Sequence, residues 1–236
     1  TDCLLPMYCG GWDPNAPTTA NGYYSREQYI ELLQYAKKNN ICVIPEIDMP
    51  GHMRACKKAM NGMLTDSVLE KRVYLSAQNY TDNVIAVTNE YAITFIDQVV
   101  TEIVKMYQDA GCELKIFNIG GDEVPNGALT QEEHQAFIDK VLGILARYNL
   151  QPMGWEEIGH FCPPHTQAIC YSWHNGDVKP MELAKAGYPV VLATVELLGV
   201  KRTLEAGKTG IYTGVKTTAG EGETAFKING FTDADG

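Results

Sequence analysis

Hydrophobic and polar residues follow two different periods along this chain. Short apolar runs predict strands, whereas segments with apolar residues three and four positions apart predict helices. Five runs have the strand pattern, at residues 41–46, 114–119, 152–155, 168–173 and 189–194. Helical patterns precede the first, second, third and fifth of these runs, at residues 26–39, 89–110, from 130 onward and 180–186.

Capping residues mark several helix ends. Ser25 can accept hydrogen bonds from the free N–H groups of the first helix. Thr130, with Glu133 three residues later, forms a capping box. Gly111 is a suitable C-terminal stop. We therefore expect helices to begin after Ser25 and at Thr130, and the long second helix to end before Gly111.

The alternation of strands and helices predicts an α/β fold with parallel strands and crossover helices. A (β/α)8 TIM-type barrel and an open doubly wound sheet both fit this pattern. Polar and aromatic residues follow several of the runs, at the end where a barrel carries its active site. Because no Gly-rich phosphate loop follows any run, the barrel is favoured.

A closed barrel needs eight strands, and the pattern supplies only part of that set. Residues 210–215 are a weaker further candidate. We expect the missing strands to belong at the N-terminus. Residues 1–200 are thus predicted to form a partial (β/α)8 catalytic barrel, and residues 201–236 to form its remainder or an irregular segment.

Composition narrows the range of partners. The chain has 236 residues, a formal net charge of −10 and no basic run, so nucleic acid is not an expected partner. Its apolar stretches are much shorter than the roughly 20 residues of a membrane span. No signal peptide is recognised in this sequence.

Cysteine usage gives little direct information about compartment. The seven cysteines include no C-x-x-C pair, which argues against a zinc ribbon or a thioredoxin-type site. Cys42 and Cys170 lie in apolar runs and are predicted to be buried thiols, whereas Cys3 and Cys9 could pair in an oxidising compartment. Asn79 begins an N-glycosylation sequon, which gives weak support for secretion.

Two adjacent acids follow the second predicted strand, in the sequence Gly120-Gly121-Asp122-Glu123. The glycines let the backbone turn sharply and let a ligand approach closely. Two close carboxylates oppose each other's ionisation, so one of them tends to keep a proton near neutral pH, as general acid catalysis on a glycosidic oxygen requires. The alternative is an acidic cap on the next helix.

A second polar group follows the first predicted strand, in the loop 45–52. Its prolines and glycine fix the backbone around Glu46, Asp48 and His52. Carboxylate and imidazole groups could bind a divalent metal ion. Alternatively they position a catalytic acid, or they merely satisfy the polar groups of a tight loop.

Trp155 and Trp173 end the third and fourth predicted strands. Either tryptophan alone would be expected in the core. Two of them at strand ends on one rim are better explained as a platform for a sugar, because apolar sugar faces pack on aromatic rings.

Together these motifs resemble family 20 glycoside hydrolases, the β-N-acetylhexosaminidases and chitobiases. The resemblance runs from about Tyr23 to Thr194 and follows four elements in order. These are Tyr24-Ser25 with the helix and Val43-Ile-Pro-Glu-Ile-Asp-Met-Pro-Gly-His52, then Gly-Gly-Asp-Glu123, Gly154-Trp-Glu-Glu157 and Tyr171-Ser-Trp173. The family has a (β/α)8 barrel and removes terminal β-linked GlcNAc or GalNAc.

The resemblance implies a retaining, substrate-assisted mechanism in which the substrate's acetamido oxygen is the nucleophile and an oxazolinium ion forms. Glu123 would be the general acid and then the base, and Asp122 would orient the acetamido group. His52, with Asp48, would orient Glu123 and adjust its acidity without contacting the substrate. Trp155 and Trp173 would wall the acetamido pocket, and no metal ion or cofactor is implied.

Three departures from the family pattern leave a second interpretation open. Asn118 occupies the usual position of a histidine, no tyrosine falls near Leu197, and an arginine-bearing first strand is absent. The alternative function is a hexosaminidase-like protein that binds N-acetylated glycans without turnover or has a structural role. Retention of Asp122 and Glu123 favours the enzyme.

The family also sets expectations about the surroundings of the protein. An N-acetylated oligosaccharide or glycoconjugate, such as one derived from chitin, is the expected partner, and a homodimer is possible. Secreted, lysosomal or periplasmic localisation is expected from the family.

Overall fold

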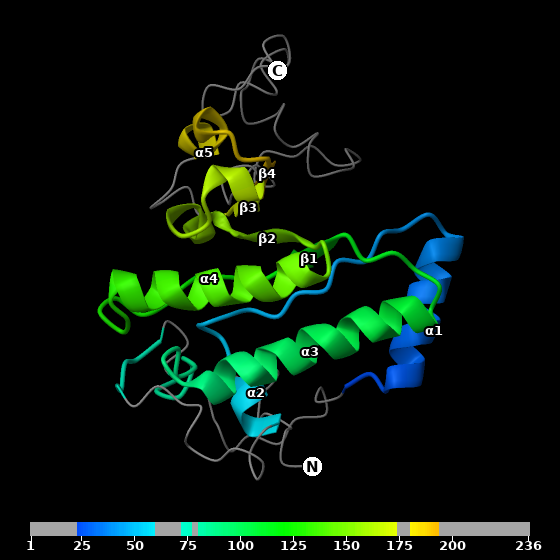
Figure 1. Ribbon diagram of the computed structural model, residues 1–236, viewed down its shortest axis with the longest axis horizontal. Coiled ribbons are helices and arrows are strands. Elements are labelled where there is room, and N and C mark those ends of the chain that lie inside the picture. Colours follow the sequence, from blue (N-terminus) through cyan, green and yellow to red (C-terminus); the bar gives the residue numbers. More distant parts are fainter. Residues whose placement is uncertain (1–22, 60–71, 77–79, 174–179, 194–236) are drawn as a thin grey trace, which may run out of the picture. The chain divides into compact units, whose positions relative to one another are not determined.

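The computed structural model describes residues 23–59, 72–76, 80–173 and 180–193, and the chain divides into two compact units, residues 1–150 and 151–236 (Figure 1). The predicted boundary at residue 200 lies outside the described residues and stays a prediction, as does the candidate strand at 210–215.

Three long helices dominate the first unit: α1 (Arg26–Lys38), α3 (Glu90–Asp109) and α4 (Gln131–Arg147). Their predicted ends are confirmed. Ser25 and Thr130 each form a capping box, with Gln28 and Glu133 respectively. Gly111 has a φ of +65°, the left-handed conformation with which a glycine commonly ends a helix. The short helix α2 (Arg54–Ala59) was not predicted.

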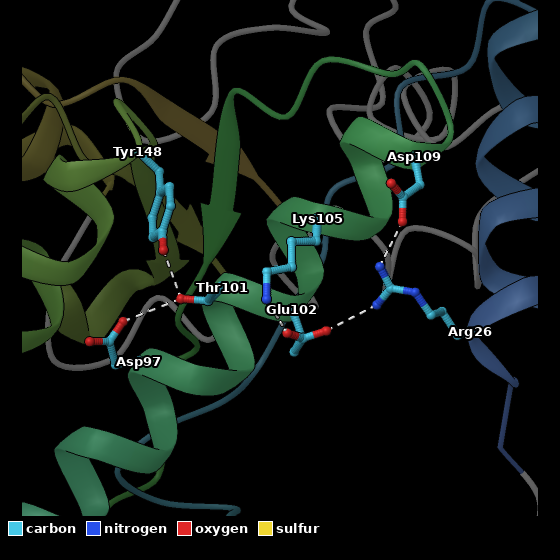
Figure 2. Close-up of polar contacts among 7 residues, drawn as sticks. All are labelled: Arg26, Asp97, Thr101, Glu102, Lys105, Asp109 and Tyr148. Carbon is cyan, nitrogen blue, oxygen red and sulfur yellow. Dashed lines mark hydrogen bonds and ion pairs between the residues drawn. The ribbon is translucent and has the colours of Figure 1, made fainter.

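Helix α3 is the central element of this unit, because both α1 and α4 contact it (Figure 1). Figure 2 shows the polar links. The Arg26 guanidinium of α1 lies between Glu102 and Asp109 of α3, at 3.0 and 2.7 Å. Thr101 of α3 is 2.7 Å from the hydroxyl of Tyr148, which follows α4. Apolar side chains buried along these helices include Leu33, Ile96, Val100, Phe137, Ile138 and Leu145.

The first predicted strand is only partly formed. Residues 41–45 are extended without strand pairing, and Glu46 makes a single parallel bridge to Asn118, the last residue of β1 (Ile116–Asn118). Ile47 N–H donates to Asn118 O and Met49 N–H to Ile119 O, both at 3.0 Å. Pro45 has no N–H to donate, which limits the ladder at this point. Because the two segments run parallel, the loops that follow Glu46 and Asn118 begin at the same end of the pair.

The prediction that Cys42 is buried is wrong. Cys42 is exposed, as are its apolar neighbours Ile41 and Ile44, whereas Cys170 is buried as predicted. Residues 41–43 line a cavity of about 550 Å³. An apolar run therefore indicated a strand-like segment here but not the burial of each residue in it.

The second unit contains a parallel sheet in the order β2 (Gln151–Trp155), β3 (Ile169–Ser172), β4 (Val190–Leu192). The register pairs Trp155 with Tyr171, and Ser172 with Leu192. Two 3-10 helices, η3 (Glu156–His160) and η4 (Pro164–Thr166), join β2 to β3, and α5 (Pro180–Ala186) precedes β4. The three predicted strands and the predicted helix are confirmed.

These observations confirm an α/β fold with parallel strands. Of the helices in the described part of the chain, none combines the length and apolar character that crossing a bilayer requires.

Candidate active site

Two loops of the first unit meet beyond the Glu46–Asn118 bridge. One carries Asp48 and His52, and the other carries Asp122 and Glu123. The parallel hydrogen bonds of residues 47 and 49 to residues 118 and 119 hold the loops side by side. We call these four residues the acid cluster.

Gly120 is required where the two loops touch. It has a φ of +69°, and a Cβ atom there would lie 1.8 Å from Oδ1 of Asp48. The next residue, Gly121, also has a positive φ and donates its N–H to the same oxygen at 3.0 Å. The glycine pair therefore makes the turn and leaves the space that the Asp48 carboxyl group fills.

The imidazole of His52 lies between the two adjacent acids. Its Nε2 atom is 3.4 Å from Oδ2 of Asp122 and 3.3 Å from Oε2 of Glu123. His52 and Glu123 have φ values of +54° and +50°, which are unfavourable for residues with a side chain. Such strained residues gather at functional sites, where the surrounding structure holds them in place.

Asp48 is a carboxyl group of this cluster that keeps a proton near neutral pH. Burial raises its pKa to about 8, and the neighbouring charge of Asp122 adds to the shift. Burial also opposes ionisation of Asp122, but the neighbouring His52 and Asp48 side chains outweigh it and hold the pKa of Asp122 below its ordinary value. Asp122 is therefore the ionised member of the pair 122–123, and Asp48 is a neighbouring carboxyl group that holds a proton.

His52 is positively charged at neutral pH. The close contact with the Asp122 carboxylate raises its pKa to about 9 against the opposing effect of burial, and the charges of Asp48, Asp122 and Glu123 contribute further. An imidazolium ion beside two acids neutralises part of their charge and fixes where their oxygens point.

The same residues have the donor atoms of a metal site. One ligand atom each from Asp48, His52 and Asp122 lies within 4.8 Å of the others. Such mixed carboxylate and imidazole sets suit several divalent ions. The ion pair between His52 and Asp122, with Asp48 beside it, is an alternative use of the same atoms.

Asn118, at the position where the resemblance implied a histidine, is tied into the turn. Its amide nitrogen donates to Glu46 Oε2 at 2.7 Å, and its Oδ1 accepts from Gly120 N–H at 2.9 Å. The side chain is buried. It thus links the first loop to the glycine turn, a role that sequence reasoning did not assign to it. Its position at the end of an apolar run was the available signal.

Trp155 and Trp173 lie together in the second unit. Their rings pack edge to face with centroids 6.3 Å apart, and Tyr171 packs on Trp155 at 5.5 Å. We call these three rings the aromatic group. Its sharing of one pocket with the acid cluster stays a prediction, because the two sets belong to different units.

Glu156 was missed as a residue that supports the aromatic group. Its side chain is 1% exposed, and its Oε2 accepts from Ser172 Oγ and from the N–H of Trp173, both at 3.0 Å. Its neighbour Glu157 accepts from the indole Nε1 of Trp173 at 3.3 Å. A charged residue directly after a strand, in a position that the alternation would bury, was the sequence signal.

Comparison with known proteins identifies a family. Residues 7–219 match the catalytic domain of glycosyl hydrolase family 20, which is a TIM barrel. β-Hexosaminidase B of Pseudoalteromonas piscicida is 33% identical over 84% of this chain and 30% of its own length. The chain therefore spans about a third of that relative and covers only part of the barrel.

Solved structures agree with this match. An inactive mutant of the family 20 exo-β-N-acetylglucosaminidase of Vibrio harveyi superposes with a TM-score of 0.63 and 29% identity, over 73% of this chain and 28% of that one. The same Vibrio harveyi enzyme in complex with N-acetylglucosamine has a TM-score of 0.60 and 28% identity over the same shares.

Proposed function

This chain belongs to glycosyl hydrolase family 20, and from that premise we propose that it carries the catalytic acids of an exo-acting, retaining β-N-acetylhexosaminidase. The substrate would be a terminal β-linked GlcNAc or GalNAc. One observation carries the proposal: Asp122 and Glu123 converge on a single imidazole nitrogen, at 3.4 and 3.3 Å.

In the first step, the acetamido oxygen of the substrate attacks the anomeric carbon. The glycosidic bond breaks, and Glu123 gives its proton to the departing oxygen. The sugar becomes an oxazolinium ion, whose positive charge Asp122 stabilises while it holds the acetamido nitrogen. Glu123 then takes a proton from water, the resulting hydroxide oxygen bonds to the anomeric carbon, and the acetamido group is restored.

The electrostatics of the acid cluster support this division of labour. Asp122 must be ionised to stabilise a cation, and its contacts with His52 and Asp48 lower its pKa. His52 contacts the Glu123 carboxyl group and orients it. We assign Trp155 and Trp173 to binding the apolar parts of the sugar, on the family resemblance.

The direct test is release of nitrophenol from a β-GlcNAc nitrophenyl glycoside. The chain should hydrolyse it, and Asp122→Asn should be severely impaired. A thiazoline analogue of the oxazolinium ion should bind much more tightly than GlcNAc. Equal affinity for the two would contradict substrate assistance.

A second candidate is a glycan-binding protein without turnover. The observation that favours it is Asn118, whose side chain is committed to Glu46 and Gly120 in the position where the family usually has a histidine. Binding of GlcNAc with no nitrophenol release at any pH would select this candidate.

A further inference from the structure

The buried carboxylate of Glu156 lies where the backbone ladder between β2 and β3 ends. Strand β2 stops at Trp155, and η3 begins with the next residue. The N–H of Trp173, just beyond the end of β3, donates to Glu156 Oε2 at 3.0 Å. The carboxylate thus replaces the backbone carbonyl that a continuing strand would have offered to Trp173.

The neighbouring acid holds the other end of the same residue. The indole N–H of Trp173 donates to Glu157 Oε2 at 3.3 Å, a long hydrogen bond that still directs the ring. Consecutive residues of one 3-10 turn therefore fix the main chain and the ring of Trp173 separately. This leaves the ring little freedom to rotate away from Trp155, whose centroid is 6.3 Å distant.

The burial of Glu156 indicates that its hydrogen bond with the N–H of Trp173 is part of the folded structure of this unit. Glu156 and Ser172 are 1% and 0% exposed, and the Ser172 hydroxyl supplies a second hydrogen bond to the same oxygen. A buried carboxylate is costly unless it is hydrogen-bonded. A sequence that needed only packing at this point would place an apolar residue there.

We propose that Glu156 and Glu157 are positioning residues that clamp Trp173 edge to face against Trp155, and so set the shape of the surface on which the acetamido group of the substrate packs. The inference rests on the proposed function for its substrate. The hydrogen bonds and the ring contact that form the clamp do not depend on which substrate is bound.

The sharpest test uses Glu157, which is only partly buried. Glu157→Met keeps the side-chain length but removes the acceptor, whereas Glu157→Gln keeps an acceptor oxygen. In Glu157→Met we expect loss of the exciton couplet of the two indoles in the circular dichroism spectrum and about a tenfold rise in KM, with a smaller change in kcat. Glu157→Gln should retain both signals. Trp155→Phe identifies the couplet.

A second pair of variants serves as a control for the main-chain half of the clamp, because both keep an acceptor for the N–H of Trp173. Glu156→Gln keeps one acceptor, and Ser172→Ala removes the hydroxyl donor of Ser172 while leaving the N–H of Trp173 bound. Both should fold and keep the couplet, with KM within about threefold of the parent.

The outcomes separate the two proposals. A couplet lost in Glu157→Met and kept in Glu157→Gln supports the clamp even if the parent protein releases no nitrophenol, which would count against the proposed function alone. An active parent whose Glu157→Met variant keeps both couplet and KM would overturn the clamp and leave the proposed function standing.

Discussion

The acid cluster and the aromatic group are held in place by different means. In the acid cluster, the backbone does most of the positioning: Gly120, Gly121, His52 and Glu123 all have positive φ values, and Asp48 fills the space that a side chain at 120 would need. In the aromatic group, regular parallel strands place the rings, and Trp173 is oriented by the hydrogen bonds that it donates to the side chains of Glu156 and Glu157. Backbone changes should therefore displace the side chains of the first region most, and loss of a hydrogen-bonding side chain should displace the rings of the second.

The two regions also differ in their ionisable groups. Asp48, His52 and Asp122 shift one another's pKa values, so the protonation of one depends on the others. The aromatic group consists of three partly buried rings, and the carboxylates of Glu156 and Glu157 accept hydrogen bonds from Trp173. This contrast fits a division between proton transfer in one region and binding in the other.

The largest effect on kcat should come from replacing Glu123, the proposed general acid of the acid cluster. Glu123→Gln cannot donate a proton, so kcat for a β-GlcNAc nitrophenyl glycoside should fall by at least about 100-fold. Glu132→Gln, on the exposed face of α4, is the matched control and should leave kcat unchanged. A Glu123→Gln variant with nearly parental kcat would place the general acid elsewhere.

A glycine substitution should show that the backbone controls the same region. Gly120→Ala puts a Cβ atom 1.8 Å from Asp48 Oδ1, so the carboxyl group must move. We expect a loss of about 1–3 kcal/mol in the free energy of unfolding, measured with denaturant, together with a large loss of kcat.

Gly143→Ala is the control for that change. Gly143 lies inside α4 with no atom within 4 Å of an added Cβ. It should raise the free energy of unfolding by about 0.5–1 kcal/mol and leave kcat intact. Equal effects of the two alanines would mean that residue 120 does not control the site.

The free energy of unfolding should fall as the pH rises from 6.5 to 8, because Asp48 and His52 have raised pKa values in the folded protein. The folded pKa of Asp48 is about 8 against an ordinary 3.8, and that of His52 is about 9 against 6.5. Between pH 6.5 and 8 the folded protein therefore holds protons that the unfolded chain has released from both groups.

Denaturant titrations across that range should give a decreasing free energy of unfolding. Asp48→Asn should flatten this slope, because it removes one of the two titrating groups. A slope that Asp48→Asn leaves unchanged would show that Asp48 titrates normally in the folded protein.

The smallest effect should come from a helix cap remote from the proposed chemistry. Thr130→Ala removes the acceptor for Glu133 N–H at the start of α4 and should cost about 1 kcal/mol of unfolding free energy. Values of kcat and KM should not change. Altered kinetics in this variant would show that α4 stability is coupled to the site.

Much of the fold and of the site could be predicted where the determining contacts are local. The caps Ser25 and Thr130 and the stop at Gly111 act within one helical turn, so they set the ends of α1, α3 and α4 without help from the rest of the chain. The order of motifs around Asp48, His52, Asp122 and Glu123 was sufficient to identify the family.

Only the tertiary structure decided matters that depend on residues far apart in sequence. Three findings depend on groups from different elements: the exposure of Cys42, the raised pKa of Asp48 beside Asp122, and the contact of Glu156 with Trp173. Burial and pairing depend on what lies beside a residue in space. The order of residues along the chain therefore determined the helices and the motifs, and folding determined which charges and rings they meet.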